Sequence, residues 1–202
     1  MLWRRYNVGA SSQSEPGEYF SWGNSDGHVR GSGYDFSQEV YNTTPGSSIA
    51  TDLDLSNDMA RNNLGAPWRL PTNVEYQELY DNCKSIWTTS EGIPGLLLTS
   101  NINGQVLFFP AAGFYDGLTL KNRNSAGYYW SSKYASTGYA VSFGFNSVSI
   151  SQNGTNKRHS GFTVRAVMEK QDNRSVVPPT PEDEPKDEET PTTEENIGKD
   201  ER

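Results

Sequence analysis

The chain of 202 residues is 33% hydrophobic and 12% aromatic and contains 19 glycines, which suits one domain of short strands and turns better than a helical bundle. Its net charge of −8 is concentrated in residues 176–202, which hold ten acidic and three basic side chains, so residues 1–175 are almost neutral with 15 acids and 14 bases. This distribution offers no basic stripe for a nucleic-acid backbone, and the single cysteine, Cys83, excludes an intrachain disulfide framework and any multi-cysteine zinc site.

The first predicted helix covers residues 53–64, LDLSNDMARNNL, and is expected to stop at Gly65 and Pro67. Four polar residues around its start imitate the opening of a calcium loop: Asp52, Asp54, Ser56 and Asp58. However, Asn57 stands where such a loop needs its sharp-turn glycine, and Asn63 stands where it needs a bidentate glutamate. Acidic residues in the first turn of a helix are favoured by the helix dipole in any case, so no metal site is predicted.

The second predicted helix lies within LPTNVEYQELYDNC and begins with a capping box, in which Thr72 is the N-cap and Glu75 reaches back to it. Helical spacing predicts one buried face formed by Val74, Tyr76, Leu79, Tyr80 and Cys83. On this face Cys83 is expected to be a small core residue, because a reactive thiol needs exposure and a nearby positive charge. Lys84 is expected on a different face of the helix.

Six short segments rich in β-branched or aromatic residues are predicted as strands: 95–100, 106–114, 127–132, 139–145, 147–151 and 162–167. Asn-Gly and Asp-Gly pairs at 103–104, 116–117 and 153–154 mark turns between them. Two helices followed by antiparallel strands predict an α+β domain over residues 1–170. Residues 171–202 are rich in Pro, Glu and Thr and nearly free of large apolar groups, so we expect a disordered tail.

Alternation along 141–151 predicts which side chains face the core. Val141, Phe143 and Phe145 alternate with Ser142 and Gly144, and then Val148 and Ile150 alternate with Ser149 and Ser151. In a half-buried strand the apolar series faces the core, so the serines and the glycine are expected to face water.

Nothing in the sequence predicts catalysis or a bound cofactor. The two histidines, His28 and His159, lie in no recognisable nucleophile motif, and neither a Gly-x-Ser-x-Gly elbow nor a phosphate-binding loop occurs. No apolar run approaches the roughly 20 residues that span a bilayer, and Met1 to Arg5 leads directly into polar sequence without a signal-peptide pattern. We therefore expect either export by another route, as for a virion component, or a fragment that lacks its export segment.

Residues 126–163 have the composition of a binding surface. They contain eight serines, five glycines, four tyrosines and three asparagines, and no aspartate or glutamate. Tyrosine supplies rigid amphipathic contact area, while serine, glycine and asparagine supply adaptable hydrogen bonds. The alternative is that serine and glycine merely line the exposed face of a solvated sheet.

Five motifs carry a family resemblance: WRRYNVGASSQSEPGEYFSWGN, GAPWRLPTNVEYQELYDNC, FFPAAGFYDG, GYYWSS and SGFTVRAV, in this order. Over about residues 2–168 the chain resembles the Fibrobacter succinogenes major paralogous domain family, in the formylglycine-generating-enzyme-like branch of the C-type lectin fold. The resemblance implies two helices flanking small antiparallel sheets, paired amino- and carboxy-terminal strands, and secreted or surface-exposed modules of gut bacteria and their phages. Many relatives are ligand-binding proteins diversified by retroelements.

Two features of the wider fold family do not carry over. The formylglycine-generating enzymes use a pair of cysteines, and this chain has only Cys83. Calcium-dependent lectins use a Glu-Pro-Asn or Gln-Pro-Asp loop, and the nearest fragment here, Glu15-Pro16-Gly17, lacks the amide ligand. The resemblance therefore implies neither that enzyme's chemistry nor that metal site.

The resemblance also implies a variable segment over residues 128–163, because mutation at adenines of AAY codons yields Asn, Tyr, Ser, Asp, Gly, Thr and Ala but not Trp, Lys or Gln. On this basis Trp130, Lys133, Gln152 and Arg165 are expected to be scaffold. The candidate ligand-contacting residues are Tyr134, Ser136, Thr137, Tyr139, Ser142, Gly144, Asn146, Ser149, Ser151, Asn153 and His159.

The sequence thus favours a non-catalytic ligand-binding module of receptor-binding or adhesion type, outside the cell, on its surface or on a virion. Its expected partner is a protein or carbohydrate on a cell surface, with no nucleic acid and no membrane insertion, and oligomerisation is compatible with it. A structural component of a virion tail or surface fibre, without a dedicated ligand site, is the alternative, and a formylglycine-generating-type enzyme is a third reading.

Overall fold

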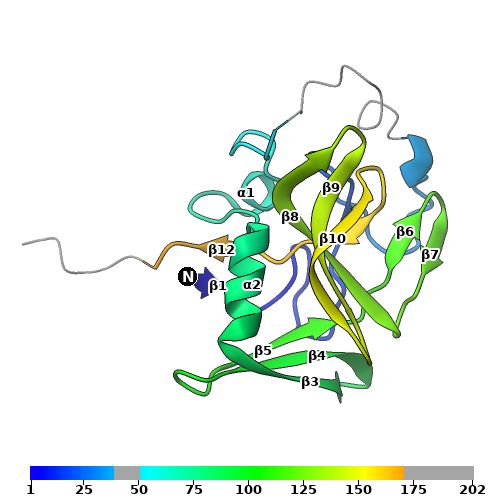
Figure 1. Cartoon of the computed structure of the whole chain (residues 1–202). Helices are drawn as coiled ribbons and strands as arrows, with labels where there is room; N and C mark the ends of the chain where they lie inside the picture. The colour runs from blue at the N-terminus through cyan, green and yellow to red at the C-terminus, as the bar shows by residue number, and fades with distance from the viewer. Residues whose placement is uncertain (39–50, 171–202) are drawn as a thin grey trace, which may run out of the picture. The chain divides into compact units, whose positions relative to one another are not determined.

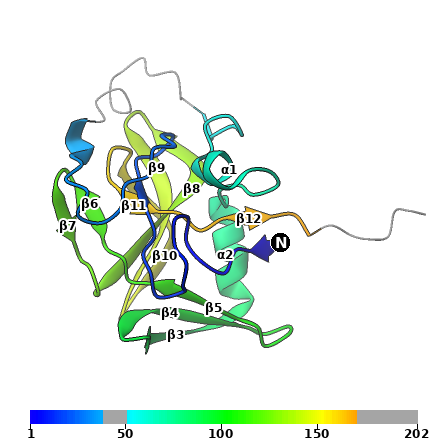
Figure 2. The ribbon, with the colours of Figure 1, turned by 180° about the vertical axis from the view of Figure 1, so that it is seen from behind.

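Short strands make up most of the ordered secondary structure (Figures 1 and 2). The computed structural model describes residues 1–38 and 51–170, which belong to one compact unit and form an α+β arrangement that is mainly sheet. The predicted disordered tail lies outside the described residues. No helix in the described ranges is long and apolar enough to cross a membrane.

The elements are β1 (Leu2–Trp3), β2 (Tyr19–Phe20), η1 (Phe36–Gln38), α1 (Met59–Leu64), α2 (Asn73–Asp81), β3 (Cys83–Ser90), β4 (Ile93–Ser100), β5 (Val106–Pro110), β6 (Phe114–Asp116), β7 (Thr119–Lys121), β8 (Ala126–Ser136), β9 (Tyr139–Asn146), β10 (Ile150–Lys157), β11 (Phe162–Thr163) and β12 (Val167–Met168).

The strands form one five-stranded sheet and three smaller ones. The large sheet has the order β10-β9-β8-β11-β2, in which only β8 and β11 run parallel. A second sheet has the order β3-β4-β5, and β6 pairs with β7. Leu2 pairs with Met168 and Trp3 with Val167, so the expected pairing of the amino- and carboxy-terminal strands is confirmed. Figure 1 shows α2 beside the β8–β10 strands and above the β3–β5 sheet, and α2 contacts both sheets.

The capping box of α2 is present as predicted, because the side chain of Thr72 accepts from the backbone of Glu75 and the Glu75 carboxylate accepts from the N–H of Thr72. The predicted buried face is only partly correct, since Tyr76 is buried but Val74 is 58% exposed. Cys83 is not in the helix. The chain passes from Asp81 almost directly into β3, a strand that the sequence analysis missed, because no glycine or proline separates the two elements.

The first helix is shorter than predicted: α1 starts at Met59 rather than at residue 53. Asp58 is its N-cap, and its carboxylate accepts from the backbone N–H of Arg61 at 3.0 Å and of Leu70 at 2.8 Å. Ahead of it, the Asp54 carboxylate accepts from Ser56 and Asn57 and closes a separate turn. Asp54 and Asp58 therefore bind backbone groups of a turn and of a helix end, while Asp52 accepts from the backbone N–H of the distant Tyr134.

Two aromatic cores support the large sheet from opposite faces. Phe143, Phe145 and Tyr129 belong to one core, which Tyr76 of α2 and Leu96 of β4 complete. A second core on the other side contains Trp22, Phe20, Trp130, Phe162, Val164 and Met59. The predicted alternation is correct for the phenylalanines of β9. The prediction that Val148 faces the core is wrong, because Val148 lies in the turn before β10 and is 89% exposed.

Arg165 is fully buried and joins three distant segments of the chain. Its guanidinium donates to Asn7 Oδ1 at 2.8 Å, to the carbonyl of Arg5 at 3.0 Å and to the carbonyl of Phe108 at 2.9 Å. The guanidinium carbon lies 4.5 Å from the ring centroid of Phe109. Arg165 thus connects the amino-terminal segment, β5 and the carboxy-terminal segment.

Replacing Arg165 with methionine is expected to lower the free energy of unfolding by at least about 3 kcal/mol, because several buried oxygen acceptors lose their donors at once. Chemical denaturation followed by tryptophan fluorescence measures the change. The matched control is Arg123→Met, on an exposed arginine, for which we expect a change within about 0.5 kcal/mol. Equal losses in the two variants would contradict this role of Arg165.

Candidate functional site

The candidate site lies on the three-stranded ribbon β8–β9–β10. A two-residue turn, Thr137-Gly138, joins β8 to β9, and Gly138 has the positive φ of 77° that this turn requires. The turn from β9 to β10 is held by Asn146, whose Oδ1 accepts from the backbone N–H groups of Val148 at 2.8 Å and Ser149 at 2.9 Å. Local sequence therefore fixes both turns of the ribbon.

One side of the ribbon packs on the core that contains Tyr76, and on its outer side Trp130 and Ala140 belong to the second core while the rest of that side is open. Tyr129 pairs with Phe143, and both are fully buried in the core beneath the ribbon. The neighbouring row consists of Tyr128, Gly144 and Ser151, which pair across all three strands. Because successive side chains point to opposite faces of a sheet, this row faces outward.

An open hollow of about 170 Å³ lies on the outer side. Five candidate residues line it: Ser142, Gly144, Asn146, Ser149 and Ser151. Five further lining residues were not selected from the sequence: Ala126, Tyr128, Phe145, Gly154 and Asn156. The hollow therefore combines hydroxyl and amide groups with an aromatic ring, a mixture that suits recognition by hydrogen bonds and stacking.

Tyr128 is the main residue of the hollow that sequence reasoning missed. Its ring packs against Phe114 with centroids 4.8 Å apart, and its hydroxyl accepts from Asn122 Nδ2 at 2.9 Å. The sequence does contain a signal for Tyr128, because period-two alternation in GYYWSS places it on the face opposite to that of the buried Tyr129.

Ser142 is not exposed, contrary to the expectation from alternation. Its side chain is fully buried, and its Oγ accepts from Asn156 Nδ2 at 2.8 Å and lies 3.4 Å from the carbonyl of Gly154. Ser142 belongs to the central strand of the ribbon, and both Ser142 and its hydrogen-bond donor Asn156 line the hollow.

A second group of candidates lies at the β8–β9 turn. Ser136 and Thr137 are exposed, and Tyr139 is 40% exposed. Tyr134 is only partly exposed, because the guanidinium carbon of Arg158 lies 5.0 Å from its ring centroid and the ring packs against the core. Tyr134 is thus part of the support of the turn as well as a candidate contact.

Support for this turn also comes from the opposite side. The Arg158 guanidinium lies 4.6 Å from the ring centroid of Trp22, so it is held between two aromatic rings. Asp52 Oδ1 accepts from the backbone N–H of Tyr134 at 2.9 Å, and Asp52 Oδ2 pairs with Lys133 at 3.2 Å. These contacts fix the base of the turn, while Ser136 and Thr137 near its tip are exposed among the described residues.

The last two candidates lie apart from both groups. Asn153 is exposed, and its Oδ1 accepts from Asn73 Nδ2, at the start of α2, at 2.7 Å. His159 is partly buried after the end of β10. Burial and the nearby Lys157 lower the pKa of the His159 imidazole, and Asp116 partly opposes this shift. The imidazole is therefore neutral at pH 7.

The four residues expected to be scaffold do not all share one environment. Trp130 and Arg165 are fully buried, which is consistent with a supporting role. Gln152 is partly buried, and Lys133 is exposed. A role as scaffold therefore has direct structural support at two of the four positions.

The side chains that the sequence raised as candidates for metal binding or reactivity have other environments in residues 1–38 and 51–170. Within these ranges no group of three or more His, Cys, Asp or Glu side chains is arranged to hold a metal ion. Burial raises the pKa of the Cys83 thiol, which disfavours the reactive thiolate. His28 stacks on Tyr34 with ring centroids 3.5 Å apart, inside a small aromatic cluster.

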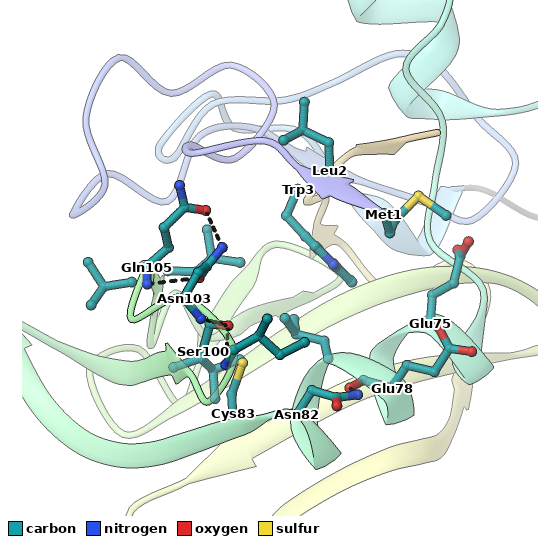
Figure 3. Close-up of a pocket in the computed structure, with 15 residues that line it drawn as sticks. Met1, Leu2, Trp3, Glu75, Glu78, Asn82, Cys83, Ser100, Asn103 and Gln105 are labelled. Carbon is teal, nitrogen blue, oxygen red and sulfur yellow. Dashed lines mark hydrogen bonds between the residues drawn. The ribbon is translucent and has the colours of Figure 1, made fainter. Parts of the chain in front are cut away.

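A larger groove of about 380 Å³ lies elsewhere, between β1, α2 and the β4–β5 hairpin (Figure 3). Trp3, Leu79 and Leu107 line it, and each also packs against the core beneath the ribbon. Glu75 and Glu78 lie on one side of the groove in Figure 3, and Asn103 and Gln105 on the other. None of the candidate residues lies in this groove.

Comparison with known families adds one match. Residues 83–167 match the model of a domain of unknown function, DUF8237. The match begins with β3 and ends in β12, so it contains the whole ribbon and both groups of candidate residues. No curated protein and no solved structure matches the chain.

The lowered pKa of His159 predicts that stability falls on acidification. Below about pH 6.5 the unfolded chain binds a proton at this imidazole that the folded chain resists, so the free energy of unfolding decreases as the pH falls from there toward the folded pKa. Denaturant titrations across this pH range should show that the free energy of unfolding depends less steeply on pH for His159→Gln than for the parent chain. Identical slopes would show that His159 titrates alike in both states.

Proposed function

We propose that the chain is a non-catalytic ligand-binding module of receptor-binding or adhesion type. Its recognition surface is the outer side of the β8–β9–β10 ribbon together with the tip of the β8–β9 turn. The single observation that carries this proposal is the hollow on that side, which is lined by serine, asparagine, glycine and tyrosine. Its walls lie on strands whose opposite face is packed into an aromatic core, so the contact groups are held in place before a ligand arrives.

The chemistry of the surface suits a polar ligand. None of the described residues that line the hollow is charged, and their hydroxyl and amide groups can both donate and accept. Tyr128 adds an aromatic ring beside them, and Tyr139 adds a second one at the turn. A carbohydrate or a polar protein surface, displayed on a cell, fits this combination best.

The proposed fold is the C-type lectin-like fold of the Fibrobacter succinogenes major paralogous domain family. Support comes from the pairing of β1 with β12 and from the capped helix α2 beside the antiparallel ribbon. In this reading the segment 128–163 is the variable segment, and the protein acts outside the cell, on a cell surface or on a virion.

One observation favours the alternative of a structural virion or fibre component. Exposed apolar side chains gather at the groove of Figure 3, where Met1 and Leu2 are each 45% exposed, Val106 is 62% exposed and Ile102 is 81% exposed. Apolar surface of this kind marks protein contacts. An enzyme of the formylglycine-generating type is not proposed, because its thiol pair has no second member in this chain.

Filling the hollow should abolish recognition without unfolding the protein. At Gly144 an added side chain has space, since a Cβ there meets nothing nearer than the Gly127 carbonyl at 3.7 Å and Tyr128 Cδ1 at 3.9 Å. Screening the labelled protein on arrays of glycans and of bacterial cells identifies a ligand, and titration then compares variants. We expect Gly144→Gln to weaken binding at least about tenfold.

The matched control is Thr155→Gln, an exposed position of β10 that pairs with Val141 and faces the opposite side of the ribbon. It should bind like the parent chain. Tyr139→Ala tests the turn separately, and it is preferable to a change at Tyr134, whose ring supports Arg158. Normal binding by both Gly144→Gln and Tyr139→Ala would refute the proposed surface.

Active diversification has its own test in the neighbouring DNA. We expect a near-copy of codons 128–165 that differs only at adenines, beside a reverse transcriptase gene. Sequencing of the locus decides this point, and a locus without such a copy leaves a ligand-binding module of constant sequence.

A further inference from the structure

β3 is a long edge strand, and no strand within residues 1–38 and 51–170 pairs with its outer edge. It is the outermost strand of the order β3-β4-β5, and Figures 1 and 2 both show its outer edge turned away from α2 and from the ribbon. All eight of its residues pair with β4 in one unbroken register, whereas both pairings of the ribbon contain irregularities. Soluble proteins usually protect such an edge with a bulge, a proline or a central charge, and β3 has only Lys84, near its start.

The register shows which backbone groups of β3 are unpaired. The N–H of Asn101 donates to the carbonyl of Asn82 at 2.9 Å, so Asn82 is a hydrogen-bonded position of this antiparallel ladder. Such positions alternate, so the even-numbered residues of β3 bond to β4. The N–H and C=O groups of Cys83, Ser85, Trp87 and Thr89 then point outward, and no backbone group of another described segment bonds to them.

The side chains of β3 are also uneven in their burial. Trp87 packs against the core beneath the ribbon, whereas Ile86, its neighbour on the opposite face, is 58% exposed. The middle of this edge therefore carries an exposed apolar side chain where soluble proteins often place a charge or a proline.

We propose that β3 pairs antiparallel with β3 of a second copy of this chain, across a two-fold axis at Ile86. The two β3-β4-β5 sheets then form one continuous six-stranded sheet. This proposal does not depend on the proposed recognition surface, because β3 and the outer side of the ribbon lie on different sheets.

The alternation of backbone groups selects a single register. When Cys83 lies opposite Thr89 of the partner, and Ser85 lies opposite Trp87 of the partner, all four outward-facing residues of each strand find a partner. Shifting the register by two residues in either direction leaves one outward-facing residue of each strand without a partner on the other strand. In the selected register each Ile86 faces its own counterpart, and the two exposed isoleucines cover each other.

The self-complementary backbone register and the exposed Ile86 select a second copy in antiparallel orientation as the occupant. Lys84 lies near the start of β3, and Glu91 follows its end in the turn to β4, where it accepts a hydrogen bond from Ser14. In the selected antiparallel register Lys84 lies opposite Thr88 of the partner, whereas a parallel copy in register would set the two Lys84 side chains side by side. Glu91 lies opposite Asp81 of the partner, just beyond the paired residues, so charge does not favour the ends of the contact. Since the contact is only one strand wide, association should be reversible and concentration-dependent.

The test is a disulfide across the two-fold axis. In the background Cys83→Ala, which removes the only cysteine, Ile86→Cys places two thiols at a non-hydrogen-bonded pair with Cα atoms about 4.5 Å apart. This separation falls within the range of roughly 4.4 to 6.8 Å that disulfides accept. With oxidised glutathione as the oxidant we expect a covalent dimer of twice the 22.4 kDa chain, which reducing agent returns to the single chain.

The matched control is Lys84→Cys in the same background. Position 84 lies opposite position 88 of the partner, so two cysteines at 84 are about 14 Å apart along the strands and should not join. Ile86→Lys, at a position already exposed, should leave the fold intact and weaken self-association at least about tenfold in sedimentation equilibrium. Cross-linking at 86 no faster than at 84, or a parent chain that sediments at 22.4 kDa at every concentration, would overturn the proposal.

Discussion

The buried guanidinium of Arg165 is the interaction on which the rest of the structure depends. Carbonyl and amide oxygens, rather than a carboxylate, surround this charge, and they come from the amino-terminal segment and from β5. Burial lowers the pKa of Arg165 to about 10, so the group is still charged at neutral pH and has to be solvated by the protein. The charge is satisfied only when the first residues, β5 and the last residues have come together. This requirement makes closure of the chain a cooperative event.

The closure of the chain around Arg165 also positions the β8–β9–β10 ribbon. Two residues before Arg165, the Thr163 side chain donates to the carbonyl of Tyr128 at 2.9 Å, and β11 runs parallel to β8 at this point. The indole of Trp130 donates to the carbonyl of Phe20 at 2.7 Å and fixes β8 from the other side. The ribbon is therefore held along β8, while much of the outer side of β9 and β10 takes no part in a core. Side chains on that side can vary at small cost to the fold, which is the physical requirement for a recognition surface.

Features that depend on contacts within a few residues of sequence, such as a helix start, could be predicted. Strand pairing and the burial of strand side chains could not, because they depend on segments elsewhere in the chain. The capping box of Thr72 and Glu75 is a contact within one turn of helix, so the start of α2 could be read directly. The end of α2 could not, because Cys83 belongs to a strand through its pairing with β4, which lies later in the chain. Ser142 shows the same limit within the candidate site. Alternation predicted that it faces water, but it is fully buried between Trp130 of β8 and Gly154 of β10, its neighbours across the sheet, and no pattern within β9 contains that information.

The central claim is that a rigid buried frame carries an outer surface whose side chains are interchangeable. It is tested most directly by a library in which Ser136, Thr137, Tyr139, Gly144, Ser149 and Ser151 are randomised together and the stability of every member is measured by proteolysis. We predict that most members lie within about 1 kcal/mol of the parent chain, because exposed positions outside special contacts change stability little. A library in which most members fail to fold would show that these side chains support the fold, and it would contradict this account.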